Sequence, residues 1–374
     1  GKVYTEDDLK SLKLDSNSEF YQICSYVLSY GIPLYVYPIF ARDINGARSA
    51  IEDYLAVIKN NEVGPLAKED ITFLVFLLPF GESYSNGGIV GISDGILSLI
   101  DNHLYFLSNK VPNFESDVPI ERIGQLERYA FIGVRPDTNV IESVRKSFVL
   151  TQGKRTAIVT GNFENVVVSP ILEKEYLIPE NKDNPLYKLN ATWQLLALQT
   201  LLAYLARNDY TLPLTQKYVP GVNFFGKRVG TLTLSNLFKQ GAMILMSDEA
   251  YEGSAVCYRS ILSSYGFLRD GQLMSYPEDV EFSILFVEDM MDKENRAYLK
   301  QFRGQKLTKA NLEFIKRQFE KVVLAGYISR GWIEAYADLR IWQDENDPTL
   351  IRGYYKYRPI YPINKIWIEH FFIV

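Results

Sequence analysis

The segment best suited to ligand chemistry is a glycine-rich loop that follows an apolar run. Residues 71–80 are almost wholly apolar and lead into Gly81-Glu-Ser-Tyr-Ser-Asn-Gly-Gly-Ile-Val-Gly91. A loop of this kind between a strand and a helix can cradle phosphate groups. However, it contains neither a Lys-Ser/Thr pair nor Gly-x-Gly-x-x-Gly. A plain flexible loop is therefore the favoured interpretation, and a nucleotide- or sugar-utilising α/β enzyme with its site at 81–91 is the alternative.

Hydrolytic chemistry would have to use one of the two histidines, His103 and His370. His103 follows Asp101-Asn102, where we expect a loop, and His370 lies in the C-terminal apolar segment. Neither stands in a recognisable nucleophile context, and the chain has no Gly-x-Ser-x-Gly motif. The sequence therefore specifies no catalytic residue.

Clustered carboxylates are the remaining candidates, because hard cations prefer oxygen ligands. The first cluster is Glu288, Asp289 and Asp292, and the second is Asp344, Glu345 and Asp347. The second lacks the glycine and the terminal glutamate of a calcium loop. Solvated acidic surface is the favoured interpretation of both clusters. Asp137 follows Arg135-Pro136 at a predicted strand end, and we interpret it as the acid that begins a helix. We predict no metal and no cofactor.

Composition predicts a folded protein of about two domains. The chain has 374 residues, of which 47% are hydrophobic and 23% charged. A net charge of −5 provides no broad basic face for nucleic acid, and no apolar run has the length needed for membrane insertion. Cys24 and Cys257 lie in apolar segments, where we expect buried, reduced thiols. The chain begins with Gly1-Lys2 rather than Met, which is consistent with a fragment of a longer subunit.

The first part of the chain alternates predicted helices and strands. Helical spacing occupies 18–30, before Gly31, and a capping box at 49–52 opens another helix. We also expect helices at 91–99 and 140–148, and strands at 34–40, 71–78, 128–134, 156–160 and 165–169. This rhythm predicts an α/β domain over residues 1–172 with a largely parallel sheet.

A polar stretch at 173–190, which contains Pro179 and Pro185, is the predicted exposed connection to a C-terminal α+β domain at 191–374. That domain should contain helices at 192–206 and from Thr308 to Gly326, with an irregular crossing at 212–230. Long strands are expected at 327–342 and 350–361. The fold class is thus α/β (α+β overall), with a mixed β-sheet core flanked by helices and a C-terminal part that ends in long strands.

The last twelve residues alternate as a β-strand would. A strand this apolar pairs inside its own domain or offers an edge to another chain. We interpret it as a subunit-contact strand that uses Ile366, Trp367, Ile368, Phe371, Phe372 and Val374.

The order of these segments resembles contractile-tail sheath proteins of tailed phages. The resemblance spans most of residues 20–374 and rests on short motifs, each weak alone. They are Gly31-Ile-Pro-Leu-Tyr-Val36, Leu78-Pro-Phe-Gly81, Val166-Val-Val-Ser-Pro170, Leu237-Phe-Lys-Gln-Gly-Ala-Met-Ile244, residues 314–327, and Tyr357-Arg-Pro-Ile-Tyr-Pro-Ile-Asn-Lys-Ile366.

The resemblance implies a structural subunit and not an enzyme. Sheath subunits form hexameric rings that stack helically around an inner tube, exchange terminal arms, and contract to drive the tube through the host envelope. The implied partners are copies of the chain itself, the tail tube protein, and baseplate and tail terminator proteins. The implied location is the virion tail, assembled in the host bacterial cytoplasm. Another tail or baseplate component that shares the sheath core is the alternative within this class.

Overall fold

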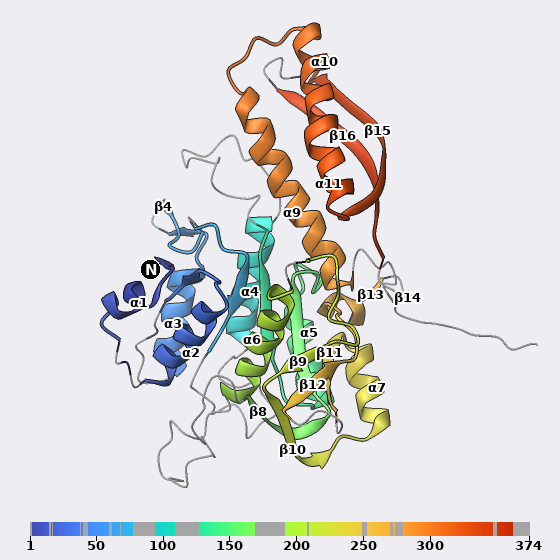
Figure 1. Cartoon of the computed structure of the whole chain (residues 1–374). Helices are drawn as coiled ribbons and strands as arrows, with labels where there is room; N and C mark the ends of the chain where they lie inside the picture. The colour runs from blue at the N-terminus through green and yellow to red at the C-terminus, as the bar shows by residue number, and fades with distance from the viewer. Residues whose placement is uncertain are drawn as a thin grey trace, which may run out of the picture. The chain divides into compact units, whose positions relative to one another are not determined.

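The computed structural model describes residues 2–14, 16, 18–37, 39, 44–59, 62–67, 69–77, 94–108, 127–168, 191–207, 209–248, 253–269, 272–273, 280–346 and 350–361. The chain forms two compact units (Figure 1). Unit 1 comprises Gly1–Asn208 and Leu214–Val280, and unit 2 comprises Asp209–Pro213 and Glu281–Val374.

Unit 1 contains helices α1 to α7 and strands β1 to β14. The helices are α1 (Glu6–Ser11), α2 (Glu19–Ser29), α3 (Ile44–Leu55), α4 (Asp94–Ser108), α5 (Thr138–Ser147), α6 (Ala191–Leu205) and α7 (Thr231–Lys239). The strands are β1 (Lys2–Val3), β2 (Leu34–Tyr35), β3 (Ile58–Lys59), β4 (Glu62–Val63), β5 (Phe73–Val75), β6 (Tyr129–Gly133), β7 (Thr156–Gly161), β8 (Phe163–Val168), β9 (Tyr218–Pro220), β10 (Val222–Arg228), β11 (Ala242–Ser247), β12 (Ser254–Cys257), β13 (Leu268–Arg269) and β14 (Gln272–Leu273).

A six-stranded mixed sheet forms the centre of unit 1, in the order β5-β6-β7-β11-β12-β9. Strands β5, β6, β7 and β11 pair in parallel with their neighbours in this order. Strand β12 pairs antiparallel with both β11 and β9. Every residue of β6 and β7 is buried, as expected of strands with helices over both faces. The predicted mixed sheet flanked by helices is therefore confirmed.

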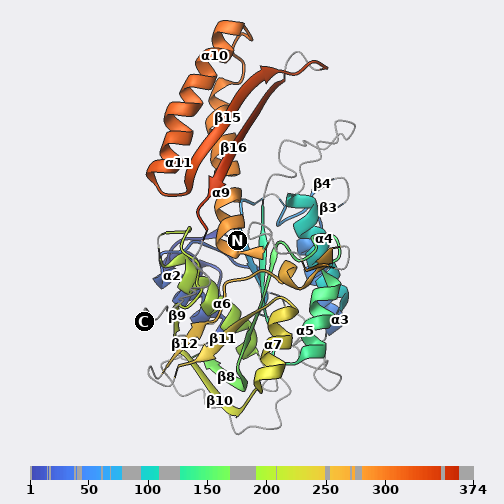
Figure 2. The same cartoon turned by 90° about the vertical axis from the view of Figure 1, so that its right-hand side faces the viewer.

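Helices α3, α4, α5 and α7 cover one face of the sheet (Figure 2). Their apolar side chains pack on the inward residues Ile132 of β6, Ile158 of β7 and Ile244 of β11. Helix α4 contributes Ile96, Leu97, Ile100 and Leu104, which recur at helical spacing and are almost fully buried. This face therefore holds an extended apolar core.

Helix α6 covers the opposite face and is tied to β6 by one side chain (Figure 2). The amide of Gln194 accepts a hydrogen bond from the backbone N–H of Gly133 (3.2 Å) and donates one to its carbonyl (2.9 Å). A glycine is needed there, because a Cβ at 133 would overlap the backbone of Trp193. The close approach fixes where α6 meets the sheet.

Residues 191–207 and 214–280 belong to unit 1, because α6 packs on β6 and β11 pairs with β7. The connection predicted at 173–190 lies outside the described residues, so the predicted domains 1–172 and 191–374 stay a prediction.

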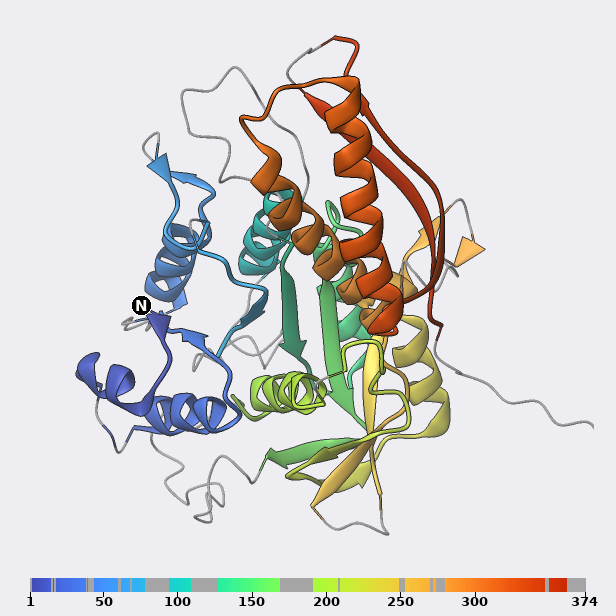
Figure 3. The same ribbon diagram turned by 45° about the horizontal axis from the view of Figure 1, so that its top comes forward.

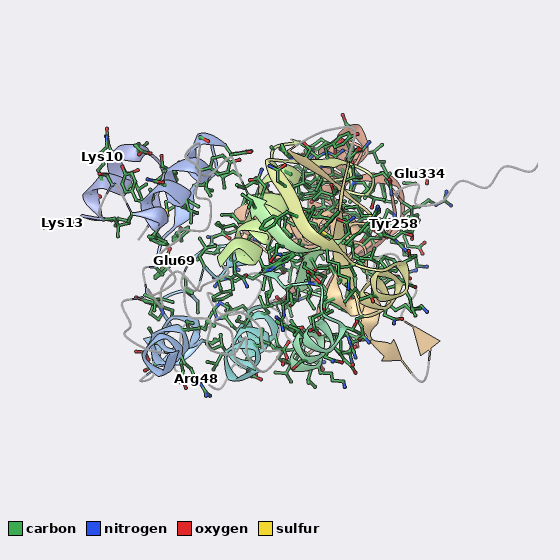
Figure 4. The ribbon with its side chains drawn as sticks, turned by 90° about the horizontal axis from the view of Figure 1, so that it is seen from below. Lys10, Lys13, Arg48, Glu69, Tyr258 and Glu334 are labelled. Carbon is green, nitrogen blue, oxygen red and sulfur yellow. The ribbon has the colours of Figure 1, made fainter. Side chains whose placement is uncertain are left out.

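Several local predictions in unit 1 are confirmed by capping contacts. Ser18 caps α2 through its hydroxyl, and Gly31 follows with φ +72°. Asp137 accepts bonds from the N–H groups of Asn139 and Val140 and so begins α5. Helix α1 forms a small layer with α2, at whose outer side Lys10 and Lys13 lie (Figure 4).

Three local predictions are wrong, each because tertiary contacts override a local pattern. The capping box at 49–52 lies inside α3, which begins at Ile44. The predicted irregular crossing at 212–230 contains β9 and β10, which pair with β12 and β8. His103 lies within α4 and not in a loop, since the helix runs on to Ser108.

The described part of unit 2 comprises helices α9, α10 and α11 and a long hairpin (Figure 3). The elements are α9 (Phe282–Leu299), α10 (Lys309–Gln318), a π-helical turn (Phe319–Leu324), α11 (Ala325–Ser329), β15 (Ile333–Gln343) and β16 (Ile351–Pro359). Thr308 caps α10, as predicted, through the N–H of Asn311. The expected strand at 327–342 begins later, because Tyr327 belongs to α11.

Replacing Gly133 by alanine should destabilise the protein by at least about 3 kcal/mol, because the new methyl group would collide with the backbone of α6. Chemical denaturation measures the change. Gly326→Ala is the matched control, since a Cβ there meets nothing within 4 Å. It should stabilise α11 by about 0.5–1 kcal/mol. Equal effects of the two substitutions would contradict the role of Gly133.

Candidate interaction surfaces

Unit 2 has its own core, built around Tyr327 of α11. The Tyr327 hydroxyl lies 3.0 Å from the Met291 carbonyl oxygen and 2.8 Å from Oδ1 of Asn295, both on α9. Burial raises the pKa of this hydroxyl well above its usual value, so it remains a donor. Asn295 in turn donates to the Tyr355 hydroxyl of β16 (3.1 Å). One hydrogen-bonded chain thus joins both helices to the hairpin.

Arg330 reinforces this junction from the surface. Its guanidinium pairs with both carboxylate oxygens of Glu294 (2.9 and 2.6 Å) and lies 3.9 Å from the ring centre of Trp332. A bidentate ion pair combined with stacking is a geometry suited to arginine. The pair therefore orients the turn between α11 and β15.

The β15–β16 hairpin packs one face on the helices and exposes the other. Its inward residues on β15 are Ile333, Tyr336, Leu339 and Ile341, which do not alternate strictly. Two bulges cause this, between 333 and 335 and between 337 and 340, and Asp338 has φ +57° at the second. The outer face carries Arg340 opposite Tyr354 and Trp342 opposite Arg352.

The hairpin is also a sheet with open edges. Among the described residues β15 and β16 pair only with each other. A two-stranded sheet is marginal alone, and its outer edges can template a further strand. This hairpin is therefore a candidate for strand addition.

The π-helical turn has an identifiable cause in the spacing of buried residues. Phe319 and Leu324 are both buried, and five positions separate them, which matches a π-turn and not an α-turn. Because the π-turn accommodates one extra residue, Ile315 before it and Tyr327 after it are both buried. The opposite side displays Val322, which is 53% exposed.

The solvent face of this helix combines apolar and basic side chains. Phe314, Val322 and Ile328 are all more than 40% exposed, and Arg317 and Lys321 are exposed beside them. Of the residues from 300 to 330, eight are basic and two are acidic. An exposed face of this composition is typical of a protein-binding surface. We call the set Phe314, Arg317, Lys321, Val322 and Ile328 the helix face.

A small pocket in unit 2 does not assemble catalytic groups. Its empty volume is about 260 Å³, part of it open to solvent, and apolar side chains such as Ile284, Met291 and Trp332 form most of the wall. Glu288 also lines it and faces Tyr357. Burial, followed by the charge of Glu288, raises the pKa of Tyr357, which favours the neutral phenol.

The structure places the other sequence candidates as follows. His103 is buried in α4, and Cys24 and Cys257 are buried thiols outside any disulfide, as predicted. In the part of the chain that the structure describes, no three potential metal-binding side chains gather. The loop 81–91, Asp347, His370 and the strand with Ile366, Trp367, Ile368, Phe371, Phe372 and Val374 lie outside the described residues. The hairpin edges and the helix face were missed, because exposure follows from tertiary packing.

Candidate membrane spans were sought among the described helices. None of these helices combines the length and the apolar character needed to cross a bilayer.

Comparison with solved structures identifies the fold. A chain of the anti-feeding prophage baseplate, from a six-fold symmetrised cryo-EM structure, covers 96% of this chain and 82% of its own length, with a TM-score of 0.55 and 12% identity. The chain therefore shares the fold of this baseplate protein's chain over nearly its whole length. The resemblance predicted from the sequence is confirmed at the level of the fold.

Two sheath tail proteins align less completely. The one from Desulfitobacterium hafniense shares 11% identity at a TM-score of 0.34, over 59% of this chain and 52% of its own. The one from Listeria innocua shares 12% identity at a TM-score of 0.36, over 72% of this chain and 60% of its own. No protein-family model and no curated protein matches the sequence.

Deleting Val322 should convert the π-turn into continuous α-helix and leave unit 2 folded, because Phe319 and Leu324 would then be four positions apart. Circular dichroism and the melting temperature test this. Val322→Ala is the control and should change stability by less than about 0.5 kcal/mol, since the side chain is exposed. Unfolding of the deletion variant alone would show that the π-turn has another cause.

Proposed function

We propose that this chain is a structural, non-catalytic subunit of a contractile tail, which polymerises as a sheath around the inner tube and contracts to drive the tube through the host envelope. The observation that carries the proposal is the likeness along 96% of the chain to a protein of the anti-feeding prophage baseplate. The subunit would be assembled in the bacterial cytoplasm and remain in the virion tail. It would contact baseplate and tail terminator proteins at the tail ends, and neither nucleic acid nor a membrane.

Strand addition is the proposed link between subunits. The hairpin supports this, because β15 and β16 present edges that no other described strand pairs. The apolar strand with Ile366, Trp367, Ile368, Phe371, Phe372 and Val374 is the proposed donor. Backbone ladders fix register and direction, so such a joint would persist while side-chain contacts between subunits rearrange.

A baseplate component is the second candidate. The same structural likeness favours it, since the matched chain belongs to a baseplate and not to a sheath. The two candidates differ in assembly: a sheath subunit extends into tubes, whereas a baseplate component stops at a single ring. Negative-stain electron microscopy of the concentrated protein distinguishes them.

Removing residues 362–374 should abolish assembly and leave a folded monomer, because the described cores of both units lie outside this segment. Analytical ultracentrifugation and negative-stain microscopy compare the trimmed protein with the intact one. As a control, Trp367→Ala and Ile368→Ala in the intact chain should weaken assembly without changing the melting temperature of the monomer. Tubes formed by the trimmed protein would refute strand donation by this segment.

The helix face is the surface that we assign to the tube protein. It is the exposed side of an otherwise well-packed helix, and it offers apolar anchors beside two cations. Neither Arg317 nor Lys321 forms an ion pair within the described residues. Such cations remain available for an acidic partner surface, where complementary charge sets the rate and specificity of docking.

The double variant Arg317→Glu and Lys321→Glu should bind the tail tube protein at least about tenfold more weakly, because two attractive charges become repulsive. Surface plasmon resonance at two salt concentrations measures affinity and its electrostatic part. The double variant Lys10→Glu and Lys13→Glu, which makes the same total charge change at and just after α1 (Figure 4), should leave binding unchanged. Equal loss in both variants would indicate a non-specific charge effect.

A further inference from the structure

His103 and Arg128 form a buried contact for which the proposed function gives no role. His103 of α4 is 1% exposed, and Arg128, next to β6, is fully buried. Arg128 Nη1 lies 2.8 Å from His103 Nε2. The other ring nitrogen, Nδ1, lies 2.7 Å from the carbonyl oxygen of Leu55 at the end of α3.

The contact fixes the protonation state of the histidine. A guanidinium can only donate hydrogen bonds, so Nε2 of His103 has to accept. The proton of the neutral ring therefore sits on Nδ1 and is donated to Leu55. Burial, together with the charge of Arg128, lowers the pKa of His103 to about 3, which agrees with the geometry.

Arg128 uses its second amino group to hold the connection between α3 and β5. Nη2 donates to the carbonyl oxygens of Leu66 and Glu69. His103 and Arg128 together contact the backbone carbonyls of Leu55, Leu66 and Glu69. These contacts link the connection to α4, which carries His103, and to the start of β6, which follows Arg128. Strand β5, to which the connection leads, is an edge strand of the six-stranded sheet.

We propose that His103 and Arg128 form a proton-sensitive latch, which holds the connection between α3 and β5 against the sheet and releases it when His103 is protonated. A protonated ring has N–H groups at both nitrogens, so Nε2 would point a donor and a positive charge at Arg128. The charged or titratable groups that act on Arg128 from neighbouring segments are Asp70, Tyr37 and Glu69. Burial lowers the pKa of Arg128 to about 10, and these three groups partly oppose that effect, so the guanidinium keeps its charge at pH 5 to 7 and repels the protonated ring.

The sign of the pH dependence follows from linkage. The open form can bind a proton on His103 at an ordinary pKa near 6.5, whereas the closed form cannot until far lower pH. The latch is therefore at full strength above about pH 6.5 and weakens as the pH falls. Opening should become about tenfold more favourable for each pH unit below that value, or about 30-fold at pH 5.

Hydrogen exchange of the intact chain at pH 7 and pH 5, corrected for intrinsic rates, tests the latch. We expect the amides between Leu55 and Val75 to lose about 30-fold in protection at pH 5. His103→Gln keeps an acceptor for Arg128 without a titrating group, and it should abolish this loss. His370→Gln, the matched control, should retain it. An equal loss in His103→Gln, or no loss in the unaltered chain, would overturn the proposal.

Histidine NMR keeps the proposal testable if His103→Gln does not fold. The chain has two histidines, so His370→Gln assigns the remaining ring signal to His103. We expect the ring of His103 to remain neutral at pH 5 in molecules whose latch amides are protected. A ring that titrates near pH 6.5 while those amides remain protected would show that protonation does not open the latch.

Discussion

Parallel pairing of β11 with β7 is the contact on which the organisation of unit 1 depends. It sets Ala242 against Ile158 and Leu245 against Gly161, and so joins segments that are far apart in the sequence. Once it forms, β12 and β9 extend the sheet, and α6 and α7 are directed to opposite faces. Such a long-range pairing costs loop-closure entropy, which the burial of β7 on both faces offsets.

Close backbone approach decides how the helices fit this sheet. Gln194 hydrogen-bonds to Gly133 as a neighbouring strand would, so the helix meets the strand without leaving polar groups unpaired. The arrangement leaves no room for a side chain on β6 at that point. In the proposed function, this close packing would let a subunit transmit force without deforming.

In the described part of unit 2, a long hairpin packs against helices and not against a sheet. The hydrogen-bonded chain from Met291 through Tyr327 and Asn295 to Tyr355 specifies one arrangement of three elements, α9, α11 and β16. The outer face and edges of the hairpin are then left to other chains. In the proposed function they are the parts through which a subunit is joined to its neighbours.

Local signals in the sequence were enough to find the helices with clear caps and the buried strands, but not α9. Caps at Asp137 and Thr308 mark helix starts correctly, because each cap is satisfied within one turn. Strands β6 and β7 could also be predicted from the sequence, because strands that are covered on both faces are continuously apolar. The interaction surfaces were not readable: Val322 is apolar yet exposed, and only the π-turn explains why.

By itself, the sequence determined the α/β class, the helix caps, the buried thiols and the likeness to tail sheath proteins. These depend on residue spacing or on contacts within a few positions. Only the tertiary structure decided the division into units, the place of His103 in a helix, and the partners of Arg128. Those features arise where distant segments meet, and no local pattern records which segments will pair.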